Sequence, residues 1–226
     1  MPAREPVMTV SGEPGRRWTR DALALPVLQV APGLLGSLLT HDGVTVRLTE
    51  VEAYAGQEDP GSHAFRGPTP RTEVMFGAAG HLYVYLSYGV HRCVNVVTGE
   101  PGSASAVLLR AGEVVDGARV ARARRLAVRS GVVPGRDLAR GPGNLARALG
   151  LGADHDGVDL LEVGGPVDLR HGPAPAPGEV RRGPRVGVSG PGGSAERFPW
   201  RFWLRSEPSV SAYRAARLPS RATSRH

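Results

Sequence analysis

The stretch that decides the fold is Val44–Tyr54, VTVRLTEVEAY, which begins with a strict alternation of apolar and polar side chains. A period of two is typical of a β-strand, and it puts Glu50 and Glu52 on the same side as the apolar residues Val44 and Val46. At the usual strand rise two such carboxylates lie about 7 Å apart. If both are buried, each therefore influences the ionisation of the other.

The chain around this strand alternates further β-rich runs with loops and helical segments. HLYVYLSY (81–88) and VHRCVNVV (90–97) are separated by Gly89 and predict a hairpin, and 104–111 predicts another strand. QEDPGSHAFRGPTPR (57–71) predicts a long functional loop. Helices are expected at 23–39, at 113–130 and after the glycine-rich turn 140–144, and the first of them should break at Pro32-Gly33. A proline-rich surface loop is expected after residue 168. Strand-like composition returns at RVGVS (185–189) and PWRFWLRS (199–206).

This order of elements favours an α+β fold over an alternating parallel plan. We expect a single mixed domain over 19–213, built on a curved, mainly antiparallel β-sheet with surrounding helices. The segments 1–18 and 214–226 are expected to be disordered tails, because they mix proline, glycine and arginine without an apolar run. No internal repeat divides the 226 residues.

Composition limits the possible functions. The single cysteine, Cys93, excludes a disulfide framework and favours a reducing cytoplasm, and no stretch is apolar enough to span a membrane. The net charge of +7 favours a polyanionic partner, although all 28 basic residues are arginine, a bias that GC-rich coding also produces. Without lysine a lysine Schiff base is impossible, and only the amine of Pro2, after removal of Met1, offers a substitute. Walker, dinucleotide, zinc-deaminase and G-x-S-x-G motifs are missing, so we expect neither a cofactor nor a metal.

Polar and aromatic side chains concentrate between Glu50 and Arg110, in a chain that is only 5% aromatic. Three of the five tyrosines fall within six residues, 83–88. Stacking platforms of this kind hold an extruded nucleic-acid base. A cross-strand aromatic core explains the same spacing and, on spacing alone, is slightly favoured.

A longer series of motifs resembles the alkyladenine (3-methyladenine) DNA glycosylase family. The series is Glu-Ala-Tyr, a loop with Asp and Ser-His, Thr-Pro-Arg, Met-Phe, Gly-x-x-Tyr-Val-Tyr, Tyr-Gly and Asn-Val, in order and with matching gaps. VLLRAGEVVDG, GPGNLARALGL, RVGV and PWRF extend the similarity to roughly Leu34–Ser211. The resemblance implies a monofunctional glycosylase that flips damaged purines out of double-stranded DNA and hydrolyses the N-glycosidic bond, leaving an abasic site for base-excision repair.

Carried over residue by residue, the resemblance also implies roles within this site. Glu52 is the general base that activates water, and Arg110 orients the base and its water. Because a general base must be ionised, we also expect the charge of Arg110 to offset the burial of Glu52. The walls of the base pocket are Tyr54, His63 and Tyr85. The remaining implied positions are Asn95 at the pocket floor, Tyr88 as the wedge in the duplex, and Arg71, Gly143, Asn144 and Arg147 as contacts to the DNA backbone.

Two positions depart from the family pattern. Asn144 stands where many members have lysine, so a phosphate contact is weakened or supplied by a neighbour such as Arg147. Pro32 and Gly33 interrupt a helix that the family keeps regular. We expect a monomer acting in the cytoplasm at the nucleoid. Two alternatives stay open: a catalytically silent lesion-binding protein, which retention of Glu52 and Arg110 disfavours, and a glycosylase specialised for a bulky alkyl adduct.

Overall fold

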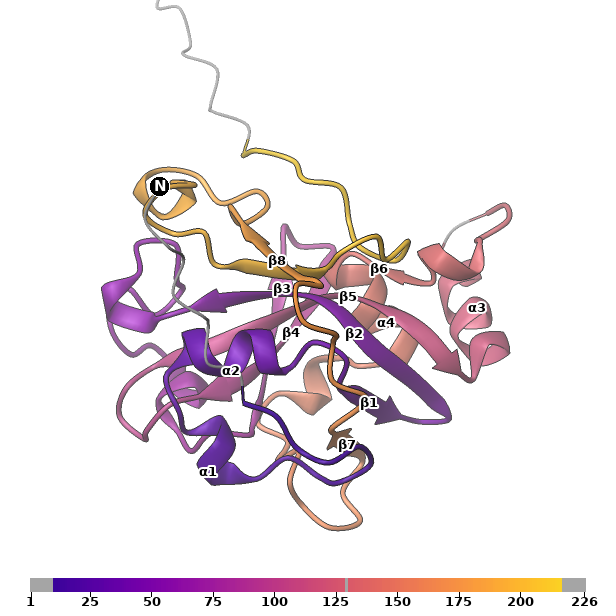
Figure 1. Cartoon of the computed structure of the whole chain (residues 1–226), viewed down its shortest axis with the longest axis horizontal. Helices are drawn as coiled ribbons and strands as arrows, with labels where there is room; N and C mark the ends of the chain where they lie inside the picture. Colours follow the sequence, from indigo (N-terminus) through magenta and orange to yellow (C-terminus); the bar gives the residue numbers. More distant parts are fainter. Residues whose placement is uncertain (1–9, 129, 217–226) are drawn as a thin grey trace, which may run out of the picture.

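The computed structural model describes residues 10–128 and 130–216, which form one antiparallel sheet with helices around it (Figure 1). The strand order along the sheet is β3-β4-β5-β2-β1-β7; β6 pairs with β5, and β9 pairs with β2 and β8. Every pairing between these strands is antiparallel, which confirms the predicted α+β class. The strands are β1 (Leu38–His41), β2 (Val44–Tyr54), β3 (Leu82–Ser87), β4 (His91–Thr98), β5 (Ser105–Asp116), β6 (Ala139–Arg140), β7 (Val167–Arg170), β8 (Val180–Gly183) and β9 (Arg201–Leu204).

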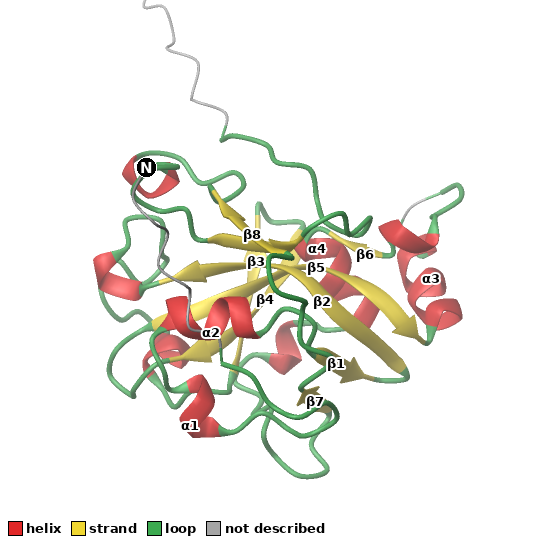
Figure 2. Cartoon of the chain, viewed as in Figure 1, coloured by secondary structure: helices red, strands yellow, loops and turns green. Residues whose placement is uncertain are grey.

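Helices are short and lie at the margins and over the sheet, whereas loops make up much of the remaining chain (Figure 2). The α-helices of the described residues are α1 (Arg20–Leu23), α2 (Val27–Gly33), α3 (Ala118–Leu126) and α4 (Pro142–Leu149). Helix α4 is present as predicted but starts within the glycine-rich turn 140–144 instead of after it, because Pro142 occupies the first helical position after Gly141. It ends at Gly150, which adopts the left-handed conformation that favours glycine.

Strand β2 has the bounds that its alternation predicts, and it is the centre of the sheet. It pairs with β5 along one edge and with β1 and then β9 along the other. Irregularities in the β2–β5 register lie on both sides of Glu50. Because neighbours cover both edges and both faces, every side chain from Leu48 to Ala53 is buried, including both carboxylates.

The predicted hairpin is present as β3 and β4, with Ser87 opposite His91. Its turn comprises Tyr88, Gly89 and Val90, and the first two have φ of +49° and +69°. Positive φ is easy for Gly89 and uncommon for tyrosine, so the turn holds Tyr88 in a constrained backbone conformation.

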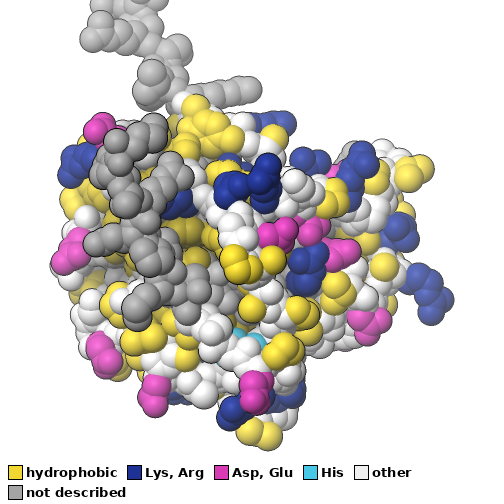
Figure 3. All heavy atoms as spheres, viewed as in Figure 1, with side chains coloured by type: hydrophobic (Ala, Val, Ile, Leu, Met, Phe, Trp, Pro, Cys, Tyr) yellow, Lys and Arg dark blue, Asp and Glu magenta, His cyan; other side chains and the backbone are white. Residues whose placement is uncertain are grey.

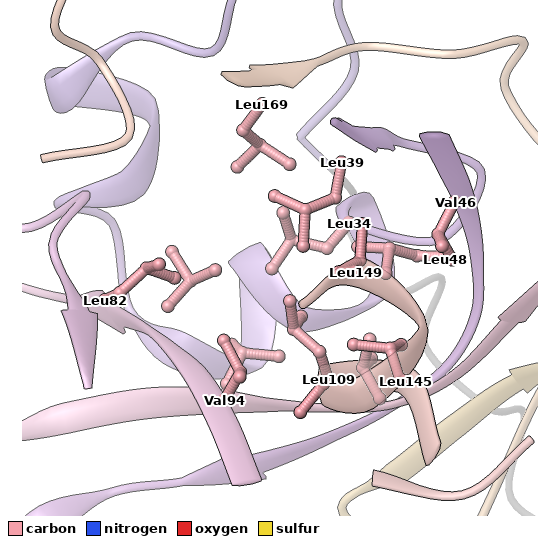
Figure 4. Packing of buried hydrophobic residues seen from close by; sticks show 14 of the residues in the cluster. Leu34, Leu39, Val46, Leu48, Leu82, Val94, Leu109, Leu145, Leu149 and Leu169 are labelled. Atoms are coloured by element: carbon pink, nitrogen blue, oxygen red, sulfur yellow. The ribbon is translucent and has the colours of Figure 1, made fainter. Parts of the chain in front are cut away.

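One large apolar core joins the helices to the sheet. Leu34, Leu39 and Val46 from the N-terminal part lie near Leu109 of β5 and Leu145 of α4 (Figure 4). A smaller cluster under the long loop includes Met75, Tyr83 and Ala106. The two clusters are separate, and the smaller one lies beside the strands that carry the aromatic side chains.

The structure corrects three local predictions. The helix expected over 113–130 begins only at Ala118, because the first four residues of that range extend β5 and pair with β2. The segment 185–189 is a turn, and the strand lies upstream at 180–183, within the expected surface loop. The helix expected over 23–39 ends at Gly33, in keeping with the predicted break, but the residues after it form β1 instead of restarting a helix.

Part of the expected N-terminal tail packs against the sheet. Trp18 is 2% exposed and stacks on His171 at 4.3 Å, and the Gly15 amide donates to the His171 carbonyl. Residues 1–9 of this tail, including Pro2, lie outside the described residues, as do residues 217–226 of the expected C-terminal tail. Over the described part of the chain, no helix is long and apolar enough to cross a membrane.

Candidate active site

A pocket of about 870 Å³ opens beside the central strand, and Glu52 lies in its lining. Pairing of β2 with β5 and β9 sets Glu52 opposite Leu108 and Arg201. Its carboxylate is fully buried and accepts hydrogen bonds from the Val186 amide at 2.7 Å and the Tyr54 hydroxyl at 2.9 Å. A carboxylate has about four acceptor sites, so the group is held in one orientation and keeps acceptor capacity toward the pocket.

Arg110 bridges the two carboxylates of β2. Its Nε lies 2.9 Å from Glu50 Oε1 and 3.5 Å from Glu52 Oε1. Arg110 is the predicted partner of Glu52; the structure brings the two together but gives Arg110 its hydrogen bond to Glu50. Burial alone would lower the pKa of Arg110, but the charges of Glu52 and Glu50 raise it above its usual value. The guanidinium is therefore charged.

Glu50 is the more heavily bonded carboxylate, although it does not line the pocket. Besides Arg110, it accepts from Arg201 Nε at 2.7 Å, from the Ser211 amide at 2.7 Å and from the Ser211 hydroxyl at 2.9 Å. Two arginines and a backbone amide thus satisfy one buried carboxylate, as burial of an ionised group requires. Ser211 also begins the C-terminal segment whose residues 214–216 line the pocket.

Aromatic rings form walls of the pocket: Tyr54, His63 and Tyr85, the three residues predicted to hold a base, all lie in its lining. The His63 ring meets the Tyr85 ring edge-on, with centroids 4.5 Å apart. Tyr83 stacks behind Tyr85 at 5.5 Å. The pocket therefore offers flat π surfaces in the same cavity as a fixed carboxylate.

Tyr54 couples the wall to the carboxylate. Its hydroxyl donates to Glu52, and burial, reinforced by the Glu52 charge, raises the pKa of Tyr54 well above its usual value. The Arg185 guanidinium lies 4.4 Å from the centre of the Tyr54 ring. Arg185 is held by Asp59 in a two-pronged ion pair and by the carbonyl of Ala53.

Arg185, Asp59 and Val186 also belong to the site, although none of them is among the residues predicted from the sequence. Asp59 belongs to the loop 57–71, and the other two to the RVGV segment, both of which were recognised only as shared motifs. Arg185 and Val186 contact Ala53 and Glu52 of β2, which precede them by more than a hundred positions. The sequence signal for Arg185 and Val186 is an arginine in a motif of otherwise apolar and small residues, RVGV; its burial is visible only in the structure.

The loop between β2 and β3 supplies His63 and Arg71. His63 Nδ1 lies 3.2 Å from the Tyr83 hydroxyl, and Arg71 lies over the Tyr85 ring at 5.4 Å. Loss of water around the ring and the positive charge of Arg71 lower the pKa of His63 to about 4. The His63 ring is therefore neutral near neutral pH.

Asn95 and Cys93 come from β4. Asn95 is 4% exposed, donates to the Tyr83 carbonyl at 3.0 Å, and lines a cavity of about 60 Å³ bounded also by Tyr54 and Tyr85. It thus lies next to the main pocket, behind its aromatic walls, rather than in its lining. Burial raises the pKa of Cys93, which does line the main pocket, so its thiol is protonated and unsuited to nucleophilic attack.

The remaining candidate residues lie at the rim. Tyr88 is 89% exposed at the hairpin tip and belongs to the pocket lining. Gly143, Asn144 and Arg147 lie in the first two turns of α4, where the Asn144 amide group donates back to the Arg140 carbonyl at 2.6 Å. Among the described residues no group of three or more histidine, cysteine, aspartate or glutamate side chains is placed to hold a metal ion.

A buried carboxylate lies in one pocket with aromatic walls, and an exposed aromatic stands at its rim. In a protein of net charge +7 this is a candidate hydrolase site for a polyanion that carries flat groups. Comparison with known proteins agrees. Residues 21–208 match the family model described as methylpurine-DNA glycosylase. The chain belongs to this family of DNA glycosylases, hydrolases that act on N-glycosyl bonds in base-excision repair, and DNA is therefore its substrate.

Three bacterial relatives illustrate the similarity, and all are provisionally named as 3-methyladenine DNA glycosylases. The protein of Streptomyces avermitilis is 53% identical over 202 residues, covering 87% of this chain and 92% of the relative. That of Nocardia farcinica is 54% identical and covers 85% and 90%, respectively. The protein of Cutibacterium acnes is 49% identical over 196 residues, which cover 85% of this chain and 98% of the relative. The family match over 21–208 includes every strand of the sheet and the pocket residues from Glu52 to Ser189, and it ends before the pocket residues 214–216.

Proposed function

We propose that this glycosylase flips alkylated purines out of double-stranded DNA into the 870 Å³ pocket and hydrolyses their N-glycosidic bond with Glu52 as general base. The observation that carries the proposal is the Glu52 carboxylate, which is buried, oriented by two hydrogen bonds and in the lining of a pocket walled by aromatic rings. A base in a duplex hides its glycosidic bond, so reaction at such a buried group requires extrusion of the nucleotide.

Tyr88 is the wedge in this proposal. It projects from a hairpin tip at the pocket rim, and an exposed aromatic at a rim can fill the gap that an extruded base leaves in the stack. Extrusion costs a few kcal/mol and is easiest for damaged or mispaired bases. Selection for damage therefore begins before the base reaches the pocket.

Stacking continues the selection. Alkylation at N3 or N7 makes a purine cationic, and a cation is attracted to the π faces of Tyr54 and Tyr85. A neutral His63 ring can contact such a base without charge repulsion. Asn95, at the back of these walls, is proposed to hinder the exocyclic amino group of guanine.

In the chemical step Glu52 removes a proton from a water molecule whose oxygen bonds to C1′ of the sugar. The N-glycosidic bond breaks and its electron pair leaves with the base, which a positive charge on the alkylated purine favours. The sugar passes through an oxocarbenium-like state that the Glu52 carboxylate stabilises. Arg110, 3.5 Å from Glu52, is proposed to orient the base and the water.

Cationic and helix-terminal groups are proposed to hold the DNA backbone. Arg71 lies at the pocket lining, and Gly143, Asn144 and Arg147 lie in α4. At the start of this helix Pro142 has no N–H and the Asn144 amide donates to the Gly141 carbonyl, so the Gly143 amide is the backbone group proposed for phosphate. Because the Asn144 side chain donates to Arg140, Arg147 is the better candidate for the contact that lysine makes in other members. We further propose that the protein acts as a monomer, in the nucleoid where its substrate lies.

The decisive experiment compares Glu52→Gln with the wild type on methylated DNA. The wild type is expected to release 3-methyladenine without added metal, whereas Glu52→Gln binds lesion DNA but releases no base. Glu58→Gln, an exposed change on the nearby loop, is the matched control and should keep the wild-type rate. Full activity of Glu52→Gln would remove Glu52 from the mechanism, and a wild type that binds lesions without releasing base would establish the silent binding protein.

A panel of lesions separates the general enzyme from one specialised for a bulky adduct. The pocket volume is near the upper end of the roughly 300–1,000 Å³ typical of pockets for drug-sized ligands, so a base larger than a methylpurine has room to enter. Duplexes with 3-methyladenine, 7-methylguanine, ethenoadenine, hypoxanthine or a bulky N-alkyl purine should be compared by kcat/KM. A large preference for the bulky base would support the specialised enzyme.

The lysine-free composition restricts the reaction to hydrolysis. Strand cleavage by a lyase step needs an amine that forms a Schiff base with the sugar. The expected product is an intact abasic site, and borohydride should trap no covalent complex. A trapped complex would indicate the amine of Pro2.

A further inference from the structure

A second hollow, of about 410 Å³, lies on the other side of the β3–β4 hairpin. We name it the arginine groove, after the three arginines in its lining, Arg92, Arg124 and Arg147. Leu86 and Val90 of the hairpin and Gly143 of α4 also line it. The hollow contains none of the residues with a proposed role in the chemical step.

The charges of the arginine groove are only partly compensated. Arg124 donates to Asp42 and to the Ala148 carbonyl. Arg92 and Arg147 have no ion pair or hydrogen-bond partner among the described residues, and no acidic residue lines the groove. Two uncompensated guanidiniums beside a third favour an anion between them, and the planar guanidinium matches phosphate with two parallel hydrogen bonds.

The positive charge at the groove is a local feature rather than a consequence of net charge alone. On the face that Figure 3 shows, basic side chains are interspersed with acidic ones, so the excess charge of +7 does not form one continuous patch there. A lining with three arginines and no acid differs from that mixed surface.

The groove and the catalytic pocket share the hairpin as a common wall. Successive side chains of a strand point to opposite faces, and on β4 Cys93 lines the pocket whereas Arg92 lines the groove. Leu86 touches both hollows. Tyr88, at the tip of the hairpin, therefore stands between them.

From this arrangement we infer that the arginine groove binds backbone phosphates of the undamaged strand of the duplex. The inference rests on the proposed function, because it takes Tyr88 as the wedge. A nucleotide that enters the pocket draws its strand to the pocket side of Tyr88. The complementary strand stays on the far side of the wedge, where Arg92 and Arg147 are free to neutralise its phosphates.

The test uses the double change Arg92→Gln with Arg147→Gln, and Arg119→Gln with Arg136→Gln as a control of equal charge. The control arginines are exposed and line neither hollow. All proteins carry Glu52→Gln, and their Kd is measured over a salt series for one lesion oligonucleotide, as a single strand and in a duplex. Thermal melting verifies that each variant is folded.

The groove variant is expected to weaken duplex binding and to lower the slope of log Kd against log salt by about 1 to 2, since each lost phosphate contact removes about 0.9. Single-strand binding should match that of the control. Arg92→Lys with Arg147→Lys should keep most of the slope. Equal losses of affinity for single-stranded and duplex DNA would place the damaged strand in the groove. A loss of affinity no larger than that of the control would show that the groove binds no DNA. Either result overturns the inference. Failure of the proposed function is distinguishable, because the wild type would then release no base.

Discussion

The floor and the rim of the pocket are built in opposite ways. At the floor, Glu52 and Arg110 line the pocket, and Arg110 binds Glu50, which lies just outside the lining. All three are at most 7% exposed and lie on paired strands, and four donors fix Glu50. At the rim, Tyr88 is 89% exposed on a three-residue turn, and Val90 beside it is 64% exposed.

The difference follows from the two tasks of the pocket. The floor must hold a carboxylate in place before the substrate arrives, whereas the rim must stay free to contact DNA. A carboxylate that meets a developing charge works best when its position costs nothing at the moment of reaction, so the floor is over-determined by hydrogen bonds. A side chain that enters DNA must not be engaged elsewhere in the protein. Changes at the floor should therefore affect folding and chemistry together, and changes at the rim should affect only the handling of DNA.

The largest effect on stability is expected from Glu50→Ala. Removing this carboxylate leaves Arg110 and Arg201 buried without their common partner, which typically costs about 3–5 kcal/mol. Urea denaturation measures the loss. The control is Glu113→Ala, which breaks a half-exposed pair with Arg47 and should cost about 0–1 kcal/mol. A cost of Glu50→Ala no greater than that of the control would mean that the floor is not held by Glu50.

Tyr54→Phe should have an intermediate effect, because it removes the hydroxyl that donates to Glu52 and keeps the ring. Hydrogen bonds to charged groups contribute about 1.5–3 kcal/mol. If half of this energy, about 0.75–1.5 kcal/mol, orients Glu52 in the transition state, single-turnover excision should slow by about 4- to 13-fold. Tyr213→Phe, an exposed change that removes a hydroxyl outside the pocket lining, is the control. An unchanged rate in Tyr54→Phe would show that the Val186 amide alone orients the carboxylate.

At the rim, Tyr88→Ser should leave the free energy of unfolding within about 0.5 kcal/mol of the wild type, as exposed substitutions usually do. Excision from duplex DNA should nevertheless fall, because nothing fills the space of the extruded base. Urea denaturation and single-turnover kinetics on the same protein provide the two values. An unfolded variant would support the other interpretation of the tyrosine cluster, an aromatic core.

The same division explains how much the sequence could predict. Strand β2 and the β3–β4 hairpin were predictable because alternation, a turn residue and chain proximity are local signals. The first residues of 113–130 look helical in isolation but extend β5, since Arg47 and Thr45 of β2 pair with Glu113 and Asp116. That pairing depends on a distant strand and leaves no local mark.

Nonlocal contacts also limited the prediction of the site. The motifs of the resemblance identified Glu52 and the aromatic walls, which the structure brings into one pocket. The donors that fix the floor come from elsewhere: Val186 and Arg201 follow β2 by more than 130 positions. Residues 180–183 look like loop because of the neighbouring prolines, and they form a strand only through β9.

The smallest expected effect concerns His63, which lies between floor and rim. Its pKa of about 4 is below the ordinary 6.5, so the unfolded chain binds the proton first as pH falls; the stabilising contribution of the neutral ring is complete above pH 6.5 and disappears toward pH 4. NMR titration of the histidine rings, with His63→Gln for assignment, should place the midpoint near 4. In Arg71→Gln the midpoint should rise but stay below 6.5, because desolvation, the larger cause, remains. A wild-type midpoint near 6.5 would mean that water reaches the His63 ring, as it reaches the rim. Only Tyr54 and Tyr85 would then form the buried wall of the pocket.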